Sequence, residues 1–195
     1  MSKRILIIQG HPDPQGKHFG HALAEAYATA AELAGHTVEI IEVAKLDFPL
    51  LRSKQEFESG SLPRVVQQAQ DSIARAEHLV FFYPLWLGTM PALLKAFLEQ
   101  VFRPGFAFDN PDAGRFWKKR LTGKSARIVI TMGMPAFFYR WYFRAHSLKN
   151  LERNILGFCG IGPIKETLLG MVDSGNNSKR SRWLAKMQHL GSCGI

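Results

Sequence analysis

The sequence has little cysteine, no long hydrophobic run and no internal repeat. Its two cysteines, Cys159 and Cys193, are too few for a disulfide framework and lack the spacing of a zinc site. No stretch approaches the ~18–20 uninterrupted apolar residues that a helix needs to cross a bilayer, which predicts no integral membrane segment. The first residues run directly into a strand pattern without the apolar core of a signal peptide. We therefore expect a single domain, residues 1–195, in the cytoplasm.

Acidic residues are scarce in the second half of the chain. Residues 1–98 contain 9 Lys or Arg and 10 Asp or Glu, whereas residues 99–195 contain 16 and 6. Such an excess of positive charge is typical of proteins that bind nucleic acid, an anionic surface or a phosphorylated ligand, and the alternative is a basic surface that serves solubility or forms a crystal or dimer face. The sequence has no helix-turn-helix, zinc-finger or RNA-binding motif, so we expect a phosphorylated cofactor and no nucleic acid.

Short apolar runs alternate with amphipathic segments along the chain. The apolar runs predict strands at Arg4–Gln9, Thr37–Val43, Leu79–Tyr83, Ala126–Met132 and, broken around Pro163, Gly157–Val172. The other segments predict helices at Phe19–Leu33, Pro63–Ala76, Pro91–Phe102, Leu148–Leu156 and Ser178–Leu190, and the polar connection Leu46–Ser61 could contain a short helix. Strands joined by helical crossovers form parallel sheets that are covered on both faces. The fold class is therefore α/β, a flavodoxin-like five-stranded parallel sheet of order 2-1-3-4-5, with a ligand expected where strands 1 and 3 end.

The loop after the first strand has the composition of an anion site. It runs from Gln9 to Phe19 with two prolines and two glycines, and a helix begins behind it near Lys17 or His18. Free N–H groups at a helix N-terminus bind anions, and Lys17 and His18 would add positive charge. The loop is neither a Walker loop nor the Gly-x-Gly-x-x-Gly loop of dinucleotide sites. The alternative is an ordinary turn in which His11 bonds to the backbone.

Two further loops should reach the same edge of the sheet. The loop after the third strand offers flat apolar faces and backbone N–H groups, which suit a planar conjugated ligand such as a flavin ring. It consists of Pro84, Leu85, Trp86, Leu87 and Gly88. The fourth strand ends in Thr131, Met132 and Gly133, whose hydroxyl and N–H groups could bond the polar edge of that ring.

An aromatic run follows the fourth strand. Residues 137–143 read Phe-Phe-Tyr-Arg-Trp-Tyr-Phe, and Arg144 comes next. The run has no one-sided period, so burying all of it inside one small domain would be difficult. We expect a hydrophobic pocket wall that is partly buried at a dimer interface, and the alternative is a patch on a membrane surface.

Five segments, distributed over nearly the whole chain, are similar to segments of a known family and occur in the same order as in that family. They are His11-Pro-Asp-Pro, residues 82–95, residues 102–108, Thr131-Met-Gly and residues 156–160. In these segments the chain resembles the flavodoxin-like NAD(P)H:quinone oxidoreductases, the DT-diaphorase type and its bacterial relatives.

The resemblance implies a homodimeric flavoenzyme that uses FAD, or alternatively FMN, with NAD(P)H as co-substrate. It implies that His11, Lys17, His18 and Phe19 hold the flavin phosphate, and that Pro84 to Leu87 line the ring opposite Thr131 and Gly133. In the family a Tyr and a His after the fourth strand help catalysis. The nearest candidates here are Tyr139 and His146, at a different spacing. An adenosine pocket would need C-terminal residues, for which the candidates are Asn176, Asn177, Lys179 and Arg182.

The predicted activity is a two-electron, ping-pong transfer of hydride from NAD(P)H to the flavin and then to a quinone or a similar acceptor. Backbone N–H groups of the Trp86–Gly88 loop would stabilise the reduced ring, and the basic second half would favour NADPH. Two alternatives are a flavodoxin-type electron carrier and a flavin-binding ancillary subunit of a potassium-efflux system. Electron carriers of that type are usually acidic, which argues against the first.

Overall fold

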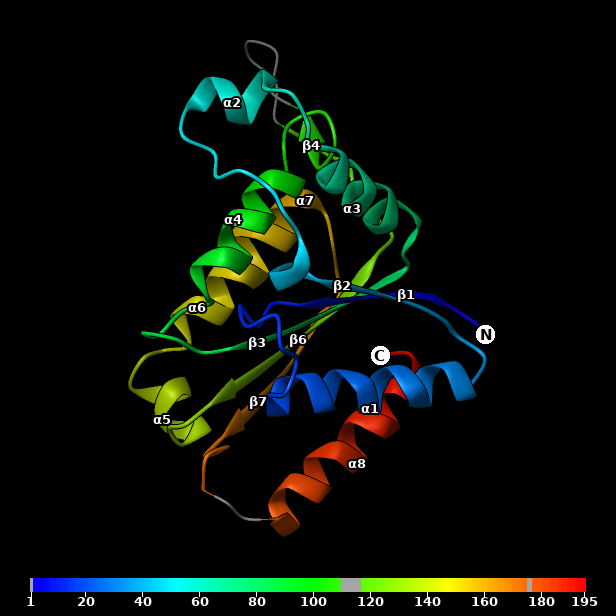
Figure 1. The fold of residues 1–195 in the computed structure, drawn as a ribbon, viewed down its shortest axis with the longest axis vertical. Helices are drawn as coiled ribbons and strands as arrows, with labels where there is room; N and C mark the ends of the chain where they lie inside the picture. The colour runs from blue at the N-terminus through cyan, green and yellow to red at the C-terminus, as the bar shows by residue number, and fades with distance from the viewer. Residues whose placement is uncertain (1, 110–116, 175–176) are drawn as a thin grey trace.

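A five-stranded parallel sheet forms the centre of the computed structural model, which describes residues 2–109, 117–174 and 177–195 (Figure 1). Its strands are β1 (Arg4–Gln9), β2 (Thr37–Glu42), β3 (His78–Pro84), β6 (Ser125–Met132) and β7 (Ile164–Gly170). The strand order is β2-β1-β3-β6-β7, and every neighbouring pair is parallel. The predicted order 2-1-3-4-5 is therefore confirmed.

Helices cover both faces of this sheet, which explains why the three central strands, β1, β3 and β6, are almost entirely buried. One face packs against α1 (Phe19–Leu33) and α8 (Asn177–Cys193), and the other against α3 (Arg64–Arg75) and α4 (Ala92–Val101) (Figure 1). Alternate residues of each strand enter the two cores: Ile5 and Ile7 face α1 and α8, whereas Leu6 and Ile8 face the opposite helices. Because all five strands are parallel, their carboxyl ends lie together along one side of the sheet, called the carboxyl edge below. The predicted ligand loops begin there.

The helix before the last strand is longer than the sequence predicts. It begins as α6 (His146–Lys149), continues as the π-helix η2 (Asn150–Leu156) and ends in α7 (Gly157–Cys159). The predicted strand Gly157–Val172 is wrong in its first part, because residues 157–159 belong to this helix and β7 starts only at Ile164. A short apolar run such as Leu-Gly-Phe-Cys suits a buried helix and a strand equally well, so periodicity cannot separate them.

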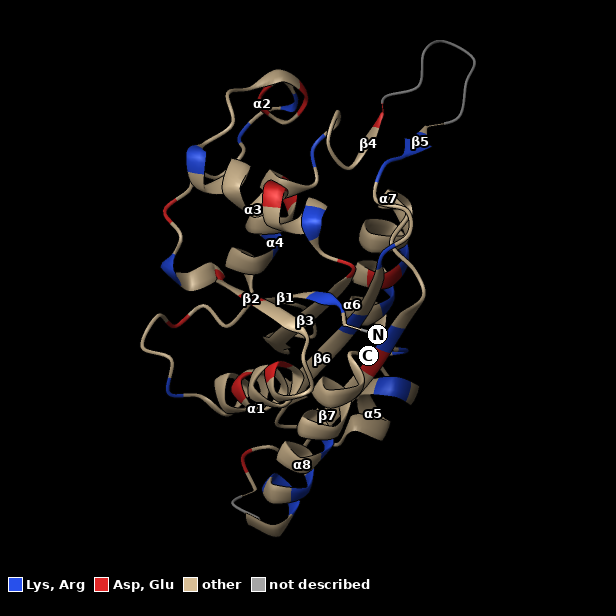
Figure 2. Ribbon diagram, turned by 90° about the vertical axis from the view of Figure 1, so that its right-hand side faces the viewer, with Lys and Arg blue, Asp and Glu red and all other residues tan. Residues whose placement is uncertain are grey.

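The remaining elements are short. The connection after β2 contains a 3₁₀ turn, η1 (Val43–Lys45), and the helix α2 (Lys54–Ser59), whose first turn is capped by Ser53 Oγ, 3.1 Å from the Glu56 N–H. A small antiparallel pair, β4 (Phe108–Asp109) and β5 (Lys118–Lys119), follows α4, and α5 (Ala136–Trp141) follows β6. Figure 2 shows basic segments at β5, beside α5 and along α8. Within the described ranges, no helix is long and apolar enough to cross a bilayer.

Candidate functional site

Three loops meet at the carboxyl edge of the sheet, as the strand order requires. The Gly10 N–H donates to the Phe82 carbonyl over 2.7 Å, and the Leu85 N–H donates to the Thr131 carbonyl over 2.8 Å. The rings of His11 and Trp86 are 6.0 Å apart, edge to face. The structure therefore brings the first, second and third predicted ligand loops into contact with one another.

The β1–α1 loop contains a cluster of histidines. The His11 ring stacks on His18 at 3.9 Å between centroids, and His21 lies 5.2 Å from His11. His11 Nδ1 accepts the Asp13 N–H over 3.1 Å, and His18 Nε2 is 2.6 Å from Asp13 Oδ2. Sequence reasoning named His11 and His18 but missed Asp13 and His21. The spacing of His18 and His21, one helical turn apart, could have indicated that they share a face with His11.

As far as the structure describes the chain, the start of α1 leaves polar groups without partners that an anion could use. Burial, followed by the neighbouring His18 and His21, lowers the pKa of His11 to about 4, and burial lowers the pKa of His21 as well. A hydrogen bond from His18 lowers the pKa of Asp13. In the described part of the chain, His21 Nδ1 is buried without a hydrogen-bond partner, and no side chain caps the first turn of α1. An anion at this point would find free helix N–H groups and imidazoles that can take up a proton.

The loop after β3 is a tight turn. Trp86 and Thr89 exchange two backbone hydrogen bonds of 2.9 Å each, and the two residues between them, Leu87 and Gly88, have φ angles of 47° and 79°. Trp86 is half-exposed, and the Leu87 side chain is fully exposed. The Trp86 N–H is used inside the turn, which corrects the expectation that it is free. Among the described residues, only the Leu87 and Gly88 N–H groups of this turn lack a partner.

The loop after β6 presents backbone rather than side chains. Thr131 and Met132 are buried, and Met132 packs in the core, so only its backbone could face a ligand. Gly133 is exposed, and a Cβ there would lie 2.8 Å from Asp173 Oδ2, the end of a side chain that can move away. The Met132 carbonyl accepts the Val172 N–H over 3.2 Å, so this loop is fixed to the end of β7.

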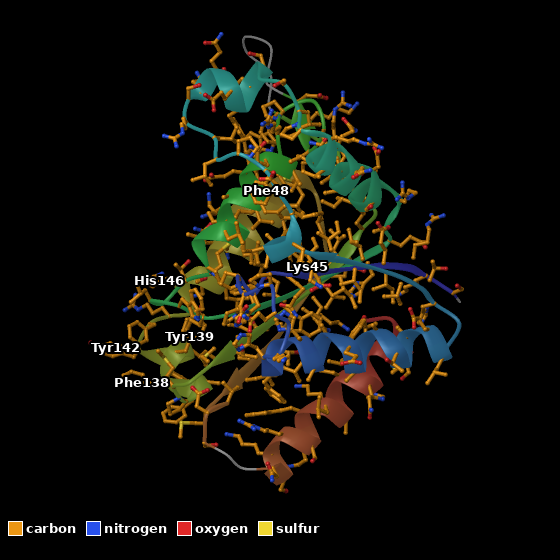
Figure 3. The ribbon with its side chains drawn as sticks, viewed as in Figure 1. Lys45, Phe48, Phe138, Tyr139, Tyr142 and His146 are labelled. Atoms are coloured by element: carbon orange, nitrogen blue, oxygen red, sulfur yellow. The ribbon has the colours of Figure 1, made fainter. Side chains whose placement is uncertain are left out.

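The two candidate catalytic residues differ in exposure. Tyr139 is fully buried, and its hydroxyl oxygen accepts the Leu148 N–H over 3.1 Å. His146 is exposed at the start of α6, and Figure 3 shows it on the same side of the molecule as Phe138 and Tyr142. In this conformation, a ligand can reach His146 but not the Tyr139 hydroxyl.

The aromatic run after β6 is mostly at the surface. Tyr139 is its only fully buried member in the structure as described, and the others leave one face of α5 and the following turn apolar and exposed. These exposed residues, called the α5 patch below, are Phe137, Phe138, Trp141, Tyr142 and Phe143. Phe138 and Tyr142 stack at 4.9 Å. The sequence-based expectation that the run cannot all be buried agrees with this exposure.

A second aromatic and basic cluster lies beside the first turn of α1. Phe19 is 5.9 Å from Trp183 between ring centroids, Lys179 Nζ lies 4.8 Å above Trp183, and the Arg180 guanidinium lies 5.7 Å from Phe19. Arg180 Nε is buried without a hydrogen-bond partner among the described residues. Of the predicted adenosine-site residues, Asn177, Lys179 and Arg182 lie on α8 with this cluster, whereas Asn176 lies outside the described residues. Sequence reasoning missed Arg180 and Trp183, although the aromatic ring four residues after Lys179 was a usable signal.

Comparison with known proteins agrees with this geometry. Residues 3–190 match the model of a family described as having the flavodoxin-like fold. The chain belongs to this family. It is 28% identical over 171 residues to an uncharacterized NAD(P)H oxidoreductase of Haemophilus influenzae, covering 86% of this chain and 83% of the relative. It is 26% identical to the human ribosyldihydronicotinamide dehydrogenase [quinone], covering 81% of this chain and 77% of that protein.

The solved structures give the same assignment. The NAD(P)H:quinone oxidoreductase from Methanothermobacter marburgensis superposes with a TM-score of 0.84 at 26% identity, covering 98% of both chains. The flavodoxin-like protein described here is therefore a distant homologue of the NAD(P)H:quinone oxidoreductases, as the sequence segments predict. Its residues fit a flavin: the orphaned His21 Nδ1 and Arg180 Nε, the uncapped α1 and the exposed face of Trp86 surround one edge of the sheet.

Proposed function

We propose that this protein is a flavin-dependent NAD(P)H:quinone oxidoreductase that reduces its acceptor by two electrons in a ping-pong sequence. The observation that carries the proposal is the convergence of the three loops, in which His11 of the anion site lies 6.0 Å from Trp86. This arrangement places an anion site next to a flat apolar face, as the phosphate and the ring of one flavin would require. The relationship to quinone reductases over most of the chain supports the same reaction.

Each loop would hold a different part of the cofactor. The first turn of α1, with His11, Lys17, His18 and Phe19, would bind the phosphate. Pro84 to Gly88 would line the ring on one side, and Thr131 to Gly133 would bond its polar edge. The bound flavin would supply the chemistry of accepting and passing on a hydride, which no side chain can perform. The free Leu87 and Gly88 N–H groups are the donors that would stabilise negative charge on the reduced ring.

We propose different roles for His146 and Tyr139. His146 is exposed and could donate a proton to the reduced acceptor. Tyr139 is buried beneath the start of the same helix, where it accepts the Leu148 N–H, so it would hold that helix rather than touch the acceptor.

We propose FAD in preference to FMN. An FAD has a second phosphate and an adenine that an FMN lacks, and both need partners beyond the β1–α1 loop. The cluster of Phe19, Trp183, Lys179 and Arg180 supplies two aromatic faces and two cations beside that loop. The basic surface of the second half would likewise favour NADPH over NADH.

A homodimer would explain two apolar features that lie apart on the chain. One is the α5 patch, and the other is an apolar cavity of about 180 Å³ between α4 and η2. In a twofold dimer, the α5 patch of one protomer can face the apolar cavity of its partner. The symmetry then repeats this contact with the two protomers exchanged. Sedimentation of the full chain tests this, because the dimer should be lost when Phe137 and Trp141 are both replaced by Ser.

The decisive experiment uses the purified full chain with added FAD or FMN. After removal of excess cofactor, we expect a yellow protein that NADPH bleaches under anaerobic conditions and that a benzoquinone turns yellow again. Acid release of the bound cofactor identifies it as FAD or FMN. A His146→Gln variant should still bleach with NADPH but reoxidise with quinone roughly a hundredfold more slowly, because a positioned proton donor typically contributes at least about this much.

The other outcomes distinguish the alternatives. A yellow protein that NADPH does not bleach would support an electron carrier or an ancillary subunit instead of an enzyme. A protein that stays colourless with both flavins would contradict all three functions.

A further inference from the structure

A buried group of hydroxyl side chains joins the candidate site to the aromatic helix. Thr89, at the end of the Trp86 turn, donates from Oγ1 to Ser147 Oγ over 3.3 Å. Ser147 is buried in the first turn of α6, and Tyr139 accepts the N–H of the next residue, Leu148, over 3.1 Å. Tyr83, the penultimate residue of β3, brings a fourth buried hydroxyl, which has no hydrogen bond of normal geometry among the described residues.

Ser147 is the member of this group that bonds to the Trp86 turn, and the next residue, Leu148, bonds to Tyr139. Burial raises the pKa of Tyr83 and of Tyr139, and in each case the Ser147 side chain partly offsets that rise. The four hydroxyls come from β3, the Trp86 turn, α5 and α6, which are separate elements. A polar group placed among apolar core residues is costly unless its partners are held in position. The two hydrogen bonds, from Thr89 to Ser147 and from the Leu148 N–H to Tyr139, therefore join the Trp86 turn, α5 and α6.

The chain reaches this cluster through an unusual backbone conformation. Arg144 and Ala145, which link α5 to α6, have φ angles of 50° and 49°. Two consecutive residues other than glycine in the left-handed region are unfavourable and persist only where surrounding contacts hold them. Ala145 is buried, its N–H donates to the Tyr139 carbonyl over 3.1 Å, and the His146 N–H donates to the Phe143 carbonyl over 3.2 Å. This path brings Ser147 Oγ to 3.3 Å from Thr89 Oγ1.

We propose that Ser147 is a positioning residue that fixes the Trp86–Thr89 turn relative to His146. The proposal rests on the proposed function, because its consequence is the alignment of the Leu87 and Gly88 N–H groups with a bound flavin. Ser147 would not touch the cofactor. It would act through Thr89, whose N–H and carbonyl close the turn on Trp86.

The test compares Ser147→Ala with a matched variant at the other edge of the sheet, Ser125→Ala. Ser125 Oγ also pairs with one buried side chain, since it lies 2.8 Å from His78 Nδ1, but it is at the amino end of β6. In the protein without flavin, we expect Ser147→Ala to speed hydrogen exchange of the Trp86 and Thr89 amides about tenfold and Ser125→Ala to leave it unchanged. In the flavin-loaded protein, Ser147→Ala should alter the visible circular dichroism of the bound flavin and slow bleaching by NADPH about tenfold.

A second variant tests the same bond from its other partner. Thr89→Val should reproduce the effect of Ser147→Ala, and the double variant should be no slower than either single variant, because both remove one interaction. Additive effects in the double variant would overturn the proposal. So would a Ser147→Ala protein with wild-type exchange rates and flavin spectrum, even if its thermal stability fell. If the wild-type protein binds no flavin, the proposed function fails with this role, whereas a yellow, active wild type with an unaffected Ser147→Ala variant contradicts the inference alone.

Discussion

The loops at the amino ends of the strands (the amino edge) and the loops at their carboxyl ends (the carboxyl edge) differ in which residues adopt left-handed backbone conformations. At the amino edge, the residues in the left-handed region are glycines, which adopt it without strain. They are Gly35, Gly105, Gly123, Gly160 and Gly194. At the carboxyl edge, the same region is occupied by residues with side chains, in addition to Gly16 and Gly88. These residues are Leu87, Arg144, Ala145 and Met171, and within the described residues they are the full set of positive-φ residues other than glycine.

This difference indicates that the carboxyl edge has a role in ligand binding in addition to its role in folding. A left-handed residue with a side chain costs about 1–2 kcal/mol, and such residues concentrate at ligand sites. In this molecule, they lie at the edge where the three loops and the histidine cluster meet. Among the described residues, the amino edge contains no residue of this kind.

The largest expected effect is on the pH dependence of folding, to which a histidine at each edge contributes. His78 at the amino edge and His11 at the carboxyl edge both have a pKa lowered to about 4, mainly by burial. Because the unfolded histidine has a pKa near 6.5, the unfolded state binds more protons between these values, and stability falls as pH falls from about 6.5 to 4. For His78, the loss is about 3 kcal/mol. Urea unfolding of the flavin-free protein across this range should show it, and His78→Asn should remove that part.

Flavin binding should affect the pKa of only one of these two histidines. A phosphate in the β1–α1 loop would raise the pKa of His11 but leave that of His78 unchanged, since His78 pairs with Ser125 at the opposite edge. With saturating FMN, the remaining pH dependence of His78→Asn should become flatter, whereas riboflavin, which has no phosphate, should not flatten it. An equal response to both ligands would contradict an anion site at His11.

Substitutions at two glycines, Gly170 and Gly191, should have effects of intermediate size on stability. A Cβ at Gly170 would lie 2.3 Å from the Ala136 nitrogen, and a Cβ at Gly191 would lie 2.2 Å from the Tyr27 carbonyl oxygen. Replacing either glycine with Ala must displace backbone, and we expect a loss of about 2 kcal/mol in each. Only Gly170→Ala pushes on the loop after β6, so only it should also weaken flavin binding, by about tenfold. Chemical denaturation and flavin titration measure the two effects, and equal affinities in the two variants would show that this loop does not contact the cofactor.

Much of this fold could be predicted because strands and helices have different periods. The strand order and the positions of the three loops follow from alternating apolar runs and crossover rules, and the structure confirms the order. The error at residues 157–159 arose where a short apolar run gave no period to measure. The family relationship could also be predicted, since it depends on local segments.

Details of the site that depend on contacts between distant residues could not be predicted. The burial of Tyr139 is one case, and so is the left-handed turn at Arg144 and Ala145, because neither residue type signals that conformation. The pairing of Phe19 with Trp183 is another, since the two residues are far apart in the sequence and meet only when α8 packs on α1. The use of the Trp86 N–H inside its own turn likewise depends on backbone geometry.

The smallest expected effect tests the comparison most directly, because it changes only backbone conformation. Leu87 has a φ of 47° and a fully exposed side chain, so Leu87→Gly removes strain without leaving a cavity. The gain of about 1–2 kcal/mol is partly offset by the greater freedom of glycine in the unfolded chain, about 0.5–1 kcal/mol, and we expect a net rise in stability of about 0.5 kcal/mol.

The matched variant at the amino edge is Gly123→Ala, where φ is 80° and a Cβ would meet no atom within 4 Å. It should lower stability by about 1 kcal/mol for the same conformational reason, with flavin affinity unchanged. Leu87→Gly should instead weaken flavin binding about threefold, because the turn loses both its rigidity and an apolar contact with the ring. If Leu87→Gly were less stable and bound flavin as tightly as the wild type, the strain at this turn would serve the fold, and the contrast between the two edges would lose its functional meaning.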